Sequence, residues 1–237
     1  MKTFVMIPTY NEKENIKSLI DKILKLNIKG LRIVVVDDNS PDGTAKIVQD
    51  ISRKNKVNLL LRTKDKGRGA AGRDGFVYCL KHGADIVVEM DADMSHDPKY
   101  IPKMIDELKE ADLVLGSRRV EGAKEIGRSW LRRFVTLGAN LYIRLMLGLK
   151  VKDCNSGFRC FKRIVLEKIN AEKLQSKGPA IVQEVLFKAH LKGFMIKEIP
   201  ITFVNRTKGK SKLGTPQLAA GYFMVLKLKA QHLLGKI

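Results

Sequence analysis

The sequence predicts an α/β fold with an open, doubly wound and mostly parallel sheet flanked by helices. Five short apolar runs follow one another in the first half of the chain, and stretches of helical periodicity lie between them. The runs are almost continuous Val, Ile and Leu, which is typical of strands that are buried on both faces. At 237 residues the chain is long enough for one catalytic-type domain with a substantial core.

Each expected element follows from its own pattern. Strands are expected at residues 3–9, 32–38, 57–63, 85–91 and 112–118. After the first strand, apolar side chains recur at the i, i+3, i+4 spacing of a helix, at Ile16, Leu19, Ile20, Ile23 and Leu24. After the fourth, Pro98 suits the first turn of a helix, where an N–H has no intrahelical partner. The apolar face of this second helix is expected to comprise Ile101, Met104, Ile105 and Leu108.

Two longer segments in the second half of the chain predict amphipathic helices, at residues 129–148 and after residue 214. The charges that interrupt them are Arg132, Arg133 and Arg144 in the first segment and Lys227 and Lys229 in the second. Neither segment suits a membrane span, whereas both suit helices that pack on the core or lie at a membrane surface. We expect a catalytic domain over residues 1–213 and a C-terminal amphipathic, membrane-associating helix over 214–237.

The positive charge is concentrated in the second half of the chain. The net charge is +20, of which residues 1–116 contribute +2 and residues 117–237 contribute +18. Such a half-molecule is expected to bind phosphate, in a phosphorylated substrate, in anionic lipid headgroups or in nucleic acid. Lysines that only keep the protein soluble are the alternative. With the two amphipathic segments, the charge favours a peripheral protein on the cytosolic face of a membrane.

The cysteines and histidines indicate neither disulfides nor a zinc site. Cys79, Cys154 and Cys160 form no even set and have no zinc-ligand spacing, so reduced thiols and a cytoplasmic location are expected. The first residues turn polar too soon for a signal peptide. The histidines are scattered, and for His96, which neighbours an acidic motif, we expect a surface or capping role.

Unusual polar residues cluster where three of the expected strands end. The sequences are PTYNE after the first strand, DDNSPDGT after the second and DADMSHD after the fourth. Ligands of doubly wound sheets bind beyond the carboxyl ends of the strands, so these loops are expected to meet at one crevice. A turn and a helix cap explain residues 39–43. They do not explain the aspartates Asp37, Asp38, Asp91 and Asp93.

Asp91 and Asp93 form a D-x-D element and indicate a metal-bridged diphosphate. On an extended chain their carboxylates share one side, and each would raise the pKa of the other unless a positive charge lay between them. Mg²⁺ prefers oxygen ligands and needs only one or two carboxylates where substrate phosphates complete its coordination. An acid/base pair that cleaves a glycosidic bond is the alternative, but such carboxylates project from separate places and straddle the bond.

The glycines Gly67, Gly69 and Gly72 match the G-x-G-x-x-G pattern of dinucleotide-binding loops. They follow the third expected strand rather than the first. Four basic residues crowd the loop: Lys64, Lys66, Arg68 and Arg73. A nicotinamide-dependent enzyme is therefore a weaker hypothesis.

Six stretches of the chain, in order, form a recognisable set. They are IPTYNEKENI (7–16), VVVDDNSPDGT (34–44), MDADMSHDP (90–98), LGSRRVEG (115–122), NSGFRCF (155–161) and IPITFVNRTKGKSKL (199–213). Together they resemble the inverting family 2 glycosyltransferases with a GT-A (Rossmann-like) fold, and among them the dolichol-phosphate mannosyltransferases. The likeness spans residues 3–213, and its fourth and sixth stretches are the most specific for transfer onto a polyprenyl phosphate.

The resemblance implies a nucleotide-sugar site at the first three stretches. It places Pro8, Tyr10 and Glu12 along the base and ribose, and Asp38 at the base or ribose edges. The backbone at Ala92 is implied to pass close to the nucleotide.

The resemblance also implies a metal ion. Asp91 and Asp93 would coordinate Mg²⁺ or Mn²⁺ on the donor diphosphate. Ser95 stands where close relatives often carry Gln as a further metal ligand, and its shorter hydroxyl is expected to act through water.

Basic residues are implied to surround the diphosphate and the acceptor phosphate. These residues are Arg118, Arg132, Arg206, Ser211 and Lys212. The implied catalytic residues are Asp93, Arg118, Arg132 and Lys212.

The implied reaction is metal-dependent, inverting transfer of mannose from GDP-mannose to dolichyl (polyprenyl) phosphate. The lipid phosphate is already anionic, so its attack needs no general base, and catalysis is electrostatic. We expect a structural or orienting role for Glu184, which lies where alcohol-using relatives carry their base. The implied partners are the sugar nucleotide, the lipid phosphate and the membrane surface, and small membrane-anchoring subunits are an open alternative.

Two other functions stay open. One keeps the mechanism but uses UDP-glucose or a UDP-N-acetylhexosamine, because the base-contacting loops do not distinguish guanine from uracil. In the other, the basic half binds nucleic acid without catalysis and the acidic loops cap helices. Only five Tyr and one Trp are present and no nucleic-acid motif is evident, which argues against this second function.

Overall fold

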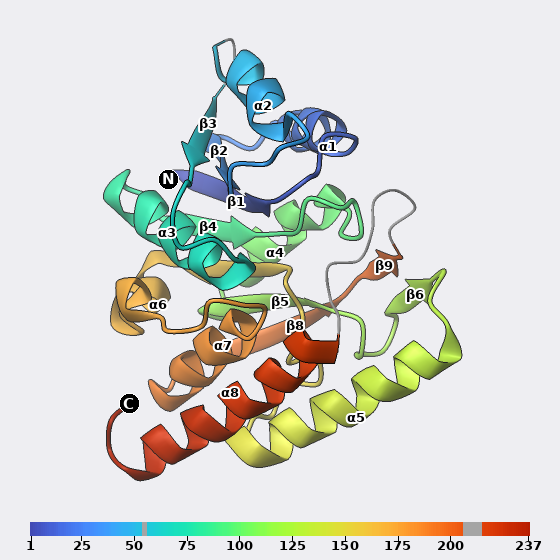
Figure 1. The fold of residues 1–237 in the computed structure, drawn as a ribbon, viewed down its shortest axis with the longest axis vertical. Coiled ribbons are helices and arrows are strands. Elements are labelled where there is room, and N and C mark those ends of the chain that lie inside the picture. Colours follow the sequence, from blue (N-terminus) through green and yellow to red (C-terminus); the bar gives the residue numbers. More distant parts are fainter. Residues whose placement is uncertain (54–55, 206–214) are drawn as a thin grey trace.

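The computed structural model describes residues 1–53, 56–205 and 215–237, and it contains the expected sheet with helices on both faces (Figure 1). Within these residues the central sheet has seven strands in the order β3-β2-β1-β4-β7-β5-β8. Neighbouring strands pair parallel except at β7, which is antiparallel to both β4 and β5. The prediction of a mostly parallel sheet is confirmed.

The five predicted strands are all present, and their ends differ from the expected ones by at most two residues. The strands of the sheet are β1 (Thr3–Thr9), β2 (Leu31–Asp37), β3 (Val57–Leu61), β4 (Ile86–Glu89), β5 (Leu113–Ser117), β7 (Arg159–Lys162) and β8 (Ile196–Pro200). Strand β7 was not expected, because a four-residue strand that begins with Arg and ends with Lys shows no apolar run. A separate parallel pair consists of β6 (Lys124–Ile126) and β9 (Thr202–Val204).

Helices cover both faces of the sheet, as predicted. One face carries α1 (Ile16–Leu24), α2 (Thr44–Ser52) and, after the 3-10 turn η1 (Pro98–Tyr100), α4 (Ile101–Glu107). The other carries α3 (Arg68–Lys81), α6 (Arg163–Lys168), the turn η2 (Ala171–Lys173) and α7 (Ile181–Leu191). Along β1, Val5 and Ile7 pack towards the first set and Phe4 and Met6 towards the second, because successive side chains of a strand point to opposite faces.

The two predicted amphipathic helices are α5 (Trp130–Leu147) and α8 (Thr215–Leu233), which lie side by side (Figure 1). The rings of Tyr142 and Tyr222 meet edge to face with their centroids 5.1 Å apart. Each helix buries one side in the core, through Ile143 and Leu147 of α5 and Val225 and Leu228 of α8. Among the residues that the structure describes, every helix is too short or too polar to traverse a lipid bilayer.

Candidate active site

Hydrogen bonds join the loops that follow β1 and β2 at the carboxyl edge of the sheet. Three main-chain N–H groups donate to three side-chain oxygens, each at 3.0 Å: Asn11 to Ser40, Glu12 to Thr44 and Lys13 to Asp42. Buried Asp37 braces the junction, since it accepts hydrogen bonds from Thr9 Oγ1 and from Ser40 N, both at 2.8 Å. Two of the three polar loops that were predicted to converge therefore meet at this edge.

The residues predicted to contact the nucleotide lie at this edge. Pro8 is buried in β1, whereas the side chain of Tyr10 is exposed. Glu12 accepts a hydrogen bond from Asn15 Nδ2 at 3.0 Å. The carboxylate of Asp38 is buried and held by the protein itself, since Oδ1 pairs with Arg62 and Oδ2 accepts from the N–H of Gly67 at 2.7 Å.

The D-x-D element lies in the loop that leaves β4. Met94 adopts a positive φ of 63°, and Asp93 Oδ1 accepts the N–H of Ser95 at 3.1 Å, so the chain turns back directly after Asp93. The Asp91 side chain is 38% exposed. A Cβ at Gly157 would stand 3.0 Å from Asp91 Oδ2, so the absence of a side chain there leaves room beside this oxygen. Asp93 is buried, whereas the Asp91 carboxylate is accessible and has space beside Oδ2, which fits a divalent ion that keeps some of its waters.

A row of alternating charges connects Asp91 with the core. Arg68 Nη2 lies 3.3 Å from Asp91 Oδ1, and Arg68 Nη1 lies 2.8 Å from Glu89 Oε1. Glu89 Oε2 in turn accepts a hydrogen bond from Arg159 Nε at 2.8 Å. The side chains of Glu89 and Arg159 have 0% exposed area, so each charge depends on its partner. Burial lowers the pKa of Arg159, although Glu89 acts in the opposite direction.

Sequence reasoning missed this row, although a signal was present. Glu89 and Arg159 are the charged residues of β4 and β7 that face each other across the antiparallel pairing. A charge inside an apolar run requires a partner of opposite sign. The NSGFRCF stretch contains that partner.

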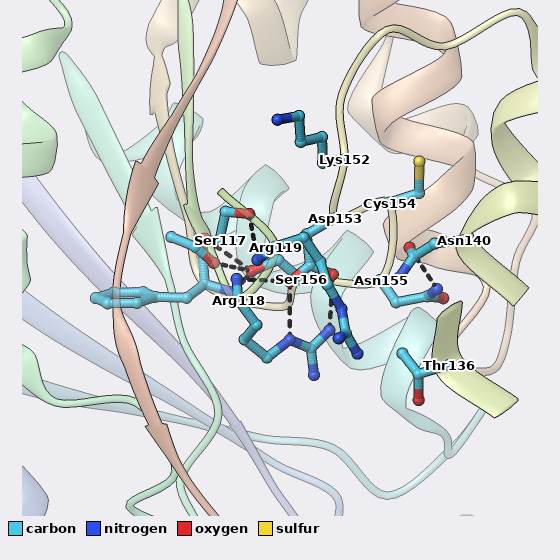
Figure 2. A network of polar contacts seen from close by, with 12 residues as sticks. Ser117, Arg118, Arg119, Thr136, Asn140, Lys152, Asp153, Cys154, Asn155 and Ser156 are labelled. Atoms are coloured by element: carbon cyan, nitrogen blue, oxygen red, sulfur yellow. Dashed lines mark hydrogen bonds and ion pairs between the residues drawn. The ribbon is translucent and has the colours of Figure 1, made fainter. Parts of the chain in front are cut away.

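Arg118 and Asp153 form a bidentate ion pair, with Arg118 Nε at 2.8 Å and Nη2 at 2.7 Å from the two carboxylate oxygens (Figure 2). Burial alone would raise the pKa of Asp153, but the hydrogen bonds and charge of Arg118 hold it below its ordinary value of 3.8. Burial alone would lower the pKa of Arg118, but the carboxylates of Asp153, Glu125 and Asp91 keep it above its ordinary value. The charges of Arg118 and Asp91 therefore attract each other. Sequence reasoning selected Arg118 and missed Asp153.

Three further arginines surround the buried carboxylate of Glu125 among the described residues. The nitrogen-to-oxygen distances are 3.4 Å for Arg119, 2.8 Å for Arg128 and 3.6 Å for Arg133. Three guanidinium groups around one carboxylate leave a surplus of two positive charges. Arg128 Nη2 also donates to Thr136 Oγ1 of α5 at 2.6 Å. We call Arg119, Arg128 and Arg133 the arginine cluster; its position fits the predicted affinity for phosphate.

Four predicted acceptor-site residues cannot be placed with their side chains. Arg132 belongs to α5, but its side chain lies outside the described part of the structure. Arg206, Ser211 and Lys212 also lie outside the described residues. The chain just before them lies against the site, because Val204 N donates to the carbonyl of buried Ser95 at 3.2 Å.

Glu184 fixes a loop rather than facing open space. It accepts hydrogen bonds from Gln175 N at 2.9 Å, from Ser176 N at 2.8 Å and from Lys188 Nζ at 2.8 Å. Burial alone would raise the pKa of Glu184, but these hydrogen bonds keep it below its ordinary value. These contacts match the orienting role that we expected.

The glycines of the GRGAAG stretch lie against this same loop. Gly69 N donates to Lys177 O at 2.8 Å, and a Cβ at Gly69 would lie 2.1 Å from Ser176 O. The pattern therefore serves close backbone packing at the start of α3.

His96 is buried, so the expected surface position is wrong. Its ring stacks on Phe158 with centroids 5.2 Å apart and meets the edge of Phe203 at 5.6 Å. Burial lowers its pKa, although nearby aspartates act in the opposite direction. Two aromatic neighbours explain the burial, and the sequence alone gave no sign of them.

The family of the chain follows from comparison with known proteins. A family model described as Glycosyl transferase family 2 matches residues 4–170. The chain belongs to glycosyl transferase family 2. The family prediction is confirmed and the chain is a glycosyltransferase, so the nicotinamide-dependent and non-catalytic nucleic-acid hypotheses are wrong.

Three relatives of this glycosyltransferase are similar over most of its length. Polyprenol monophosphomannose synthase of Mycolicibacterium smegmatis is 37% identical, with 94% of this chain and 85% of that protein covered. Undecaprenyl-phosphate mannosyltransferase of Micrococcus luteus is 37% identical, with 90% and 88% covered. Dolichol-phosphate mannosyltransferase of Pyrococcus furiosus is 39% identical over 90% of this chain, which spans 59% of that protein.

Solved structures confirm the predicted GT-A fold. Glucosyl-3-phosphoglycerate synthase of Mycobacterium tuberculosis, in complex with Mn²⁺, UDP-glucose and phosphoglyceric acid, matches this glycosyltransferase with a TM-score of 0.68. The identity is 18%, and 97% of this chain and 79% of that chain are covered. At this identity the likeness shows the shared fold.

Proposed function

We propose that this glycosyltransferase transfers mannose from GDP-mannose to a dolichyl-type polyprenyl phosphate, with inversion at the anomeric carbon and with Mg²⁺ or Mn²⁺ bound. The observation that carries the proposal is the juxtaposition of the accessible Asp91 of the D-x-D element with the partly buried Arg68 and Arg118 at one sheet edge. The names of the three relatives, which share mannose and a polyprenyl phosphate, support this choice of substrates.

The donor is proposed to bind across the loops after β1, β2 and β4. Pro8, Tyr10 and Glu12 would line the base and ribose, and the exposed ring of Tyr10 offers a stacking surface. Asp38, held by Arg62 and Gly67, would present a fixed edge to the base or ribose. The backbone of Ala92 would pass along the nucleotide.

The metal ion is proposed to bind at Asp91 and Asp93, with Ser95 acting through water. When bound, it would neutralise the charge that develops on the leaving diphosphate. The protein would position these carboxylates for the ion. The hydrogen bond from Ser95 N orients the Asp93 carboxylate, and the absence of a side chain at Gly157 leaves room beside Asp91 Oδ2.

The acceptor phosphate is proposed to lie opposite the leaving group. Arg118 would hold it together with Arg132, Arg206, Ser211 and Lys212, so that two anionic groups can approach each other. A phosphate oxygen forms the new bond to the anomeric carbon while the bond to the diphosphate oxygen breaks, and the electron pair leaves with the diphosphate. No proton has to be removed from a phosphate oxygen that is already anionic, so Glu184 is free to keep its loop contacts.

The membrane surface is proposed to meet α5 and α8. Their outward sides carry large apolar side chains, including Trp130 with 76% and Phe223 with 71% of its area exposed. The arginine cluster lies at the start of α5, where it would face anionic headgroups. A peripheral position on the cytosolic face would bring the lipid phosphate to the site, and small anchoring subunits would use the same surface.

An assay with a panel of donors tests the function. GDP-mannose, UDP-glucose and UDP-N-acetylglucosamine are each incubated with a short polyprenyl phosphate and Mg²⁺ or Mn²⁺, and lipid-linked sugar is measured by mass spectrometry. The proposal expects polyprenyl phosphate mannose from GDP-mannose, and about 100-fold less of it, or still less, with Asp93→Asn. Product from a UDP-sugar alone would replace the donor assignment, and no product from any donor would overturn the function.

A further inference from the structure

Arg68 places a positive charge next to Asp91, the first aspartate of the D-x-D element. It is the first residue of α3, and its backbone is fixed on both sides, by Gly67 N bonded to Asp38 at 2.7 Å and Gly69 N bonded to Lys177 at 2.8 Å. From this position its guanidinium lies between Glu89 and Asp91. The Arg68 side chain is 22% exposed, so solvent and ligands can reach it.

The two contacts of Arg68 differ in kind. The contact with Glu89 is short, at 2.8 Å, and its acceptor has no exposed area. The contacts with Asp91 are longer, at 3.4 Å from Nε and 3.3 Å from Nη2, and Asp91 is accessible. Breaking a buried ion pair costs far more than exchanging a solvated one. Arg68 can therefore release Asp91 while it keeps Glu89.

Charge balance shows why Arg68 matters for Asp91. Glu89 already faces the buried guanidinium of Arg159, so these two charges cancel. Arg68 is the additional positive charge, and Asp91 is the additional negative charge. A role limited to neutralising Glu89 would give the buried group a net positive charge, whereas the contact with Asp91 balances it.

We propose that Arg68 is an exchangeable counter-cation of the D-x-D element. Before the donor binds, Arg68 holds Asp91 and competes with the divalent ion for this carboxylate. When the ion binds Asp91, the N–H groups of Arg68 that had donated to Asp91 donate to the donor diphosphate instead. The diphosphate as the receiving anion rests on the proposed function. A diphosphate can satisfy both cations at once, so metal and donor would bind cooperatively and the metal alone would bind weakly.

The test measures Mn²⁺ binding by electron paramagnetic resonance, without nucleotide and with GDP or UDP. In Arg68→Gln the competing cation is gone, so Mn²⁺ alone is expected to bind at least about 5-fold more tightly than in the wild type. Nucleoside diphosphate in the presence of Mn²⁺ is expected to bind at least about 5-fold more weakly, because one of its two cations is lost. The two shifts have opposite signs. The matched control is Arg73→Gln in the same helix, which removes the same charge at an ion pair with Asp74 and should change neither affinity.

Arg68→Lys separates this role from folding. A single ammonium cannot bridge both carboxylates as a guanidinium does, and the buried Glu89 is expected to retain it. This variant should keep the thermal stability of the wild type and still bind Mn²⁺ alone more tightly. If neither variant tightens Mn²⁺ binding, or if both bind Mn²⁺ and nucleotide more weakly, Arg68 has a structural role and the proposal is overturned.

The outcome does not depend on the sugar or the lipid. Mn²⁺ titrations need neither substrate, so they decide the role of Arg68 even if the donor panel yields no lipid-linked sugar. Conversely, polyprenyl phosphate mannose formation with unchanged Mn²⁺ affinities in both variants would retain the proposed function and reject this inference.

Discussion

Arg118 donates two hydrogen bonds to Asp153, from Nε at 2.8 Å and from Nη2 at 2.7 Å, and the Asp153 side chain has no exposed area. Asp153→Asn removes the negative charge and leaves a largely buried guanidinium without its counter-ion. The free energy of unfolding is expected to fall by about 3 kcal/mol, measured by urea denaturation at pH 7. The control is Glu167→Gln, which weakens the exposed pair with Arg163 and should cost about 0.5 kcal/mol or less. Equal losses in the two variants would contradict the importance of the buried pair.

The contribution of Asp153 is expected to depend on pH with a defined sign. Its folded-state pKa lies below the ordinary value of 3.8, so the stabilisation is complete above that pH and is lost as the pH falls through the lower, folded-state pKa. The stability difference between wild type and Asp153→Asn should therefore be constant near neutrality and shrink below about pH 4. Chemical denaturation at a series of pH values measures it. A difference that grows in acid would have the wrong sign.

Gly69 is predicted to be irreplaceable for steric reasons. A Cβ there would lie 2.1 Å from the carbonyl oxygen of Ser176, whose N–H donates to Glu184 of α7 and fixes this part of the loop. Gly69→Ala should lower the free energy of unfolding by about 2 kcal/mol, although Ala favours helix. Gly138→Ala in α5 is the matched control, since its Cβ meets nothing within 4 Å, and it should raise stability by up to about 1 kcal/mol. Thermal denaturation of both variants would show the opposite signs.

The buried parallel strands of this fold could be predicted from the sequence, whereas polar contacts between distant residues could not. Continuous Val and Ile located β1 and β2, because parallel strands covered on both faces need apolar side chains on both sides. Strand β7 was not predicted, because it contains the buried charge of Arg159. This charge is compensated by Glu89, which is far away in the sequence. Pairings of this kind depend on strand order, and no local pattern reports it.

The candidate site shows the same division. The D-x-D element and Arg118 were identified from motifs that are local in sequence. Their partners, Arg68 and Asp153, became visible only when the fold placed α3 and the loop before β7 at the same sheet edge. Motifs thus indicated the chemistry, whereas the fold supplied the counter-charges.

Glu184 is predicted to position a loop and not to remove a proton. Glu184→Gln loses charge-assisted hydrogen bonds to Gln175 and Ser176 and the ion pair with Lys188. The turnover number is expected to fall by less than about 10-fold, with a pH–rate profile of unchanged shape, because a general base would contribute about 100-fold or more. Steady-state rates between pH 5.5 and about 9 provide the measurement. Disappearance of one limb of the profile in the variant would identify Glu184 as the base.

Donor and acceptor sites are expected to respond to different substitutions. Asp93→Asn should lower metal-dependent turnover by about 100-fold or more, because stabilisation of the leaving diphosphate is lost. Lys212→Ala should raise the KM for polyprenyl phosphate by about 10-fold, the loss expected for one charged contact to phosphate, with little change in donor binding. Initial rates at varied donor and acceptor concentrations separate the two effects. If Lys212→Ala weakened the donor instead, Lys212 would belong to the diphosphate side of the site.

Membrane attachment is predicted to depend on apolar side chains of α5 and α8 as well as on charge. Phe134 and Phe223 are largely exposed, one on each helix. Because both rings would be buried in the membrane interface, the double variant Phe134→Ser with Phe223→Ser should bind anionic liposomes about 10-fold or more weakly. Leu61→Ser, at the exposed end of β3 across the sheet, is the matched control and should bind as the wild type does. Flotation at low and high salt measures the bound fraction. The wild type should lose part of its binding at high salt, where the charges of the arginine cluster are screened, and keep the part that the apolar residues supply. Binding that the double substitution leaves unchanged would assign attachment to charge alone or to another surface.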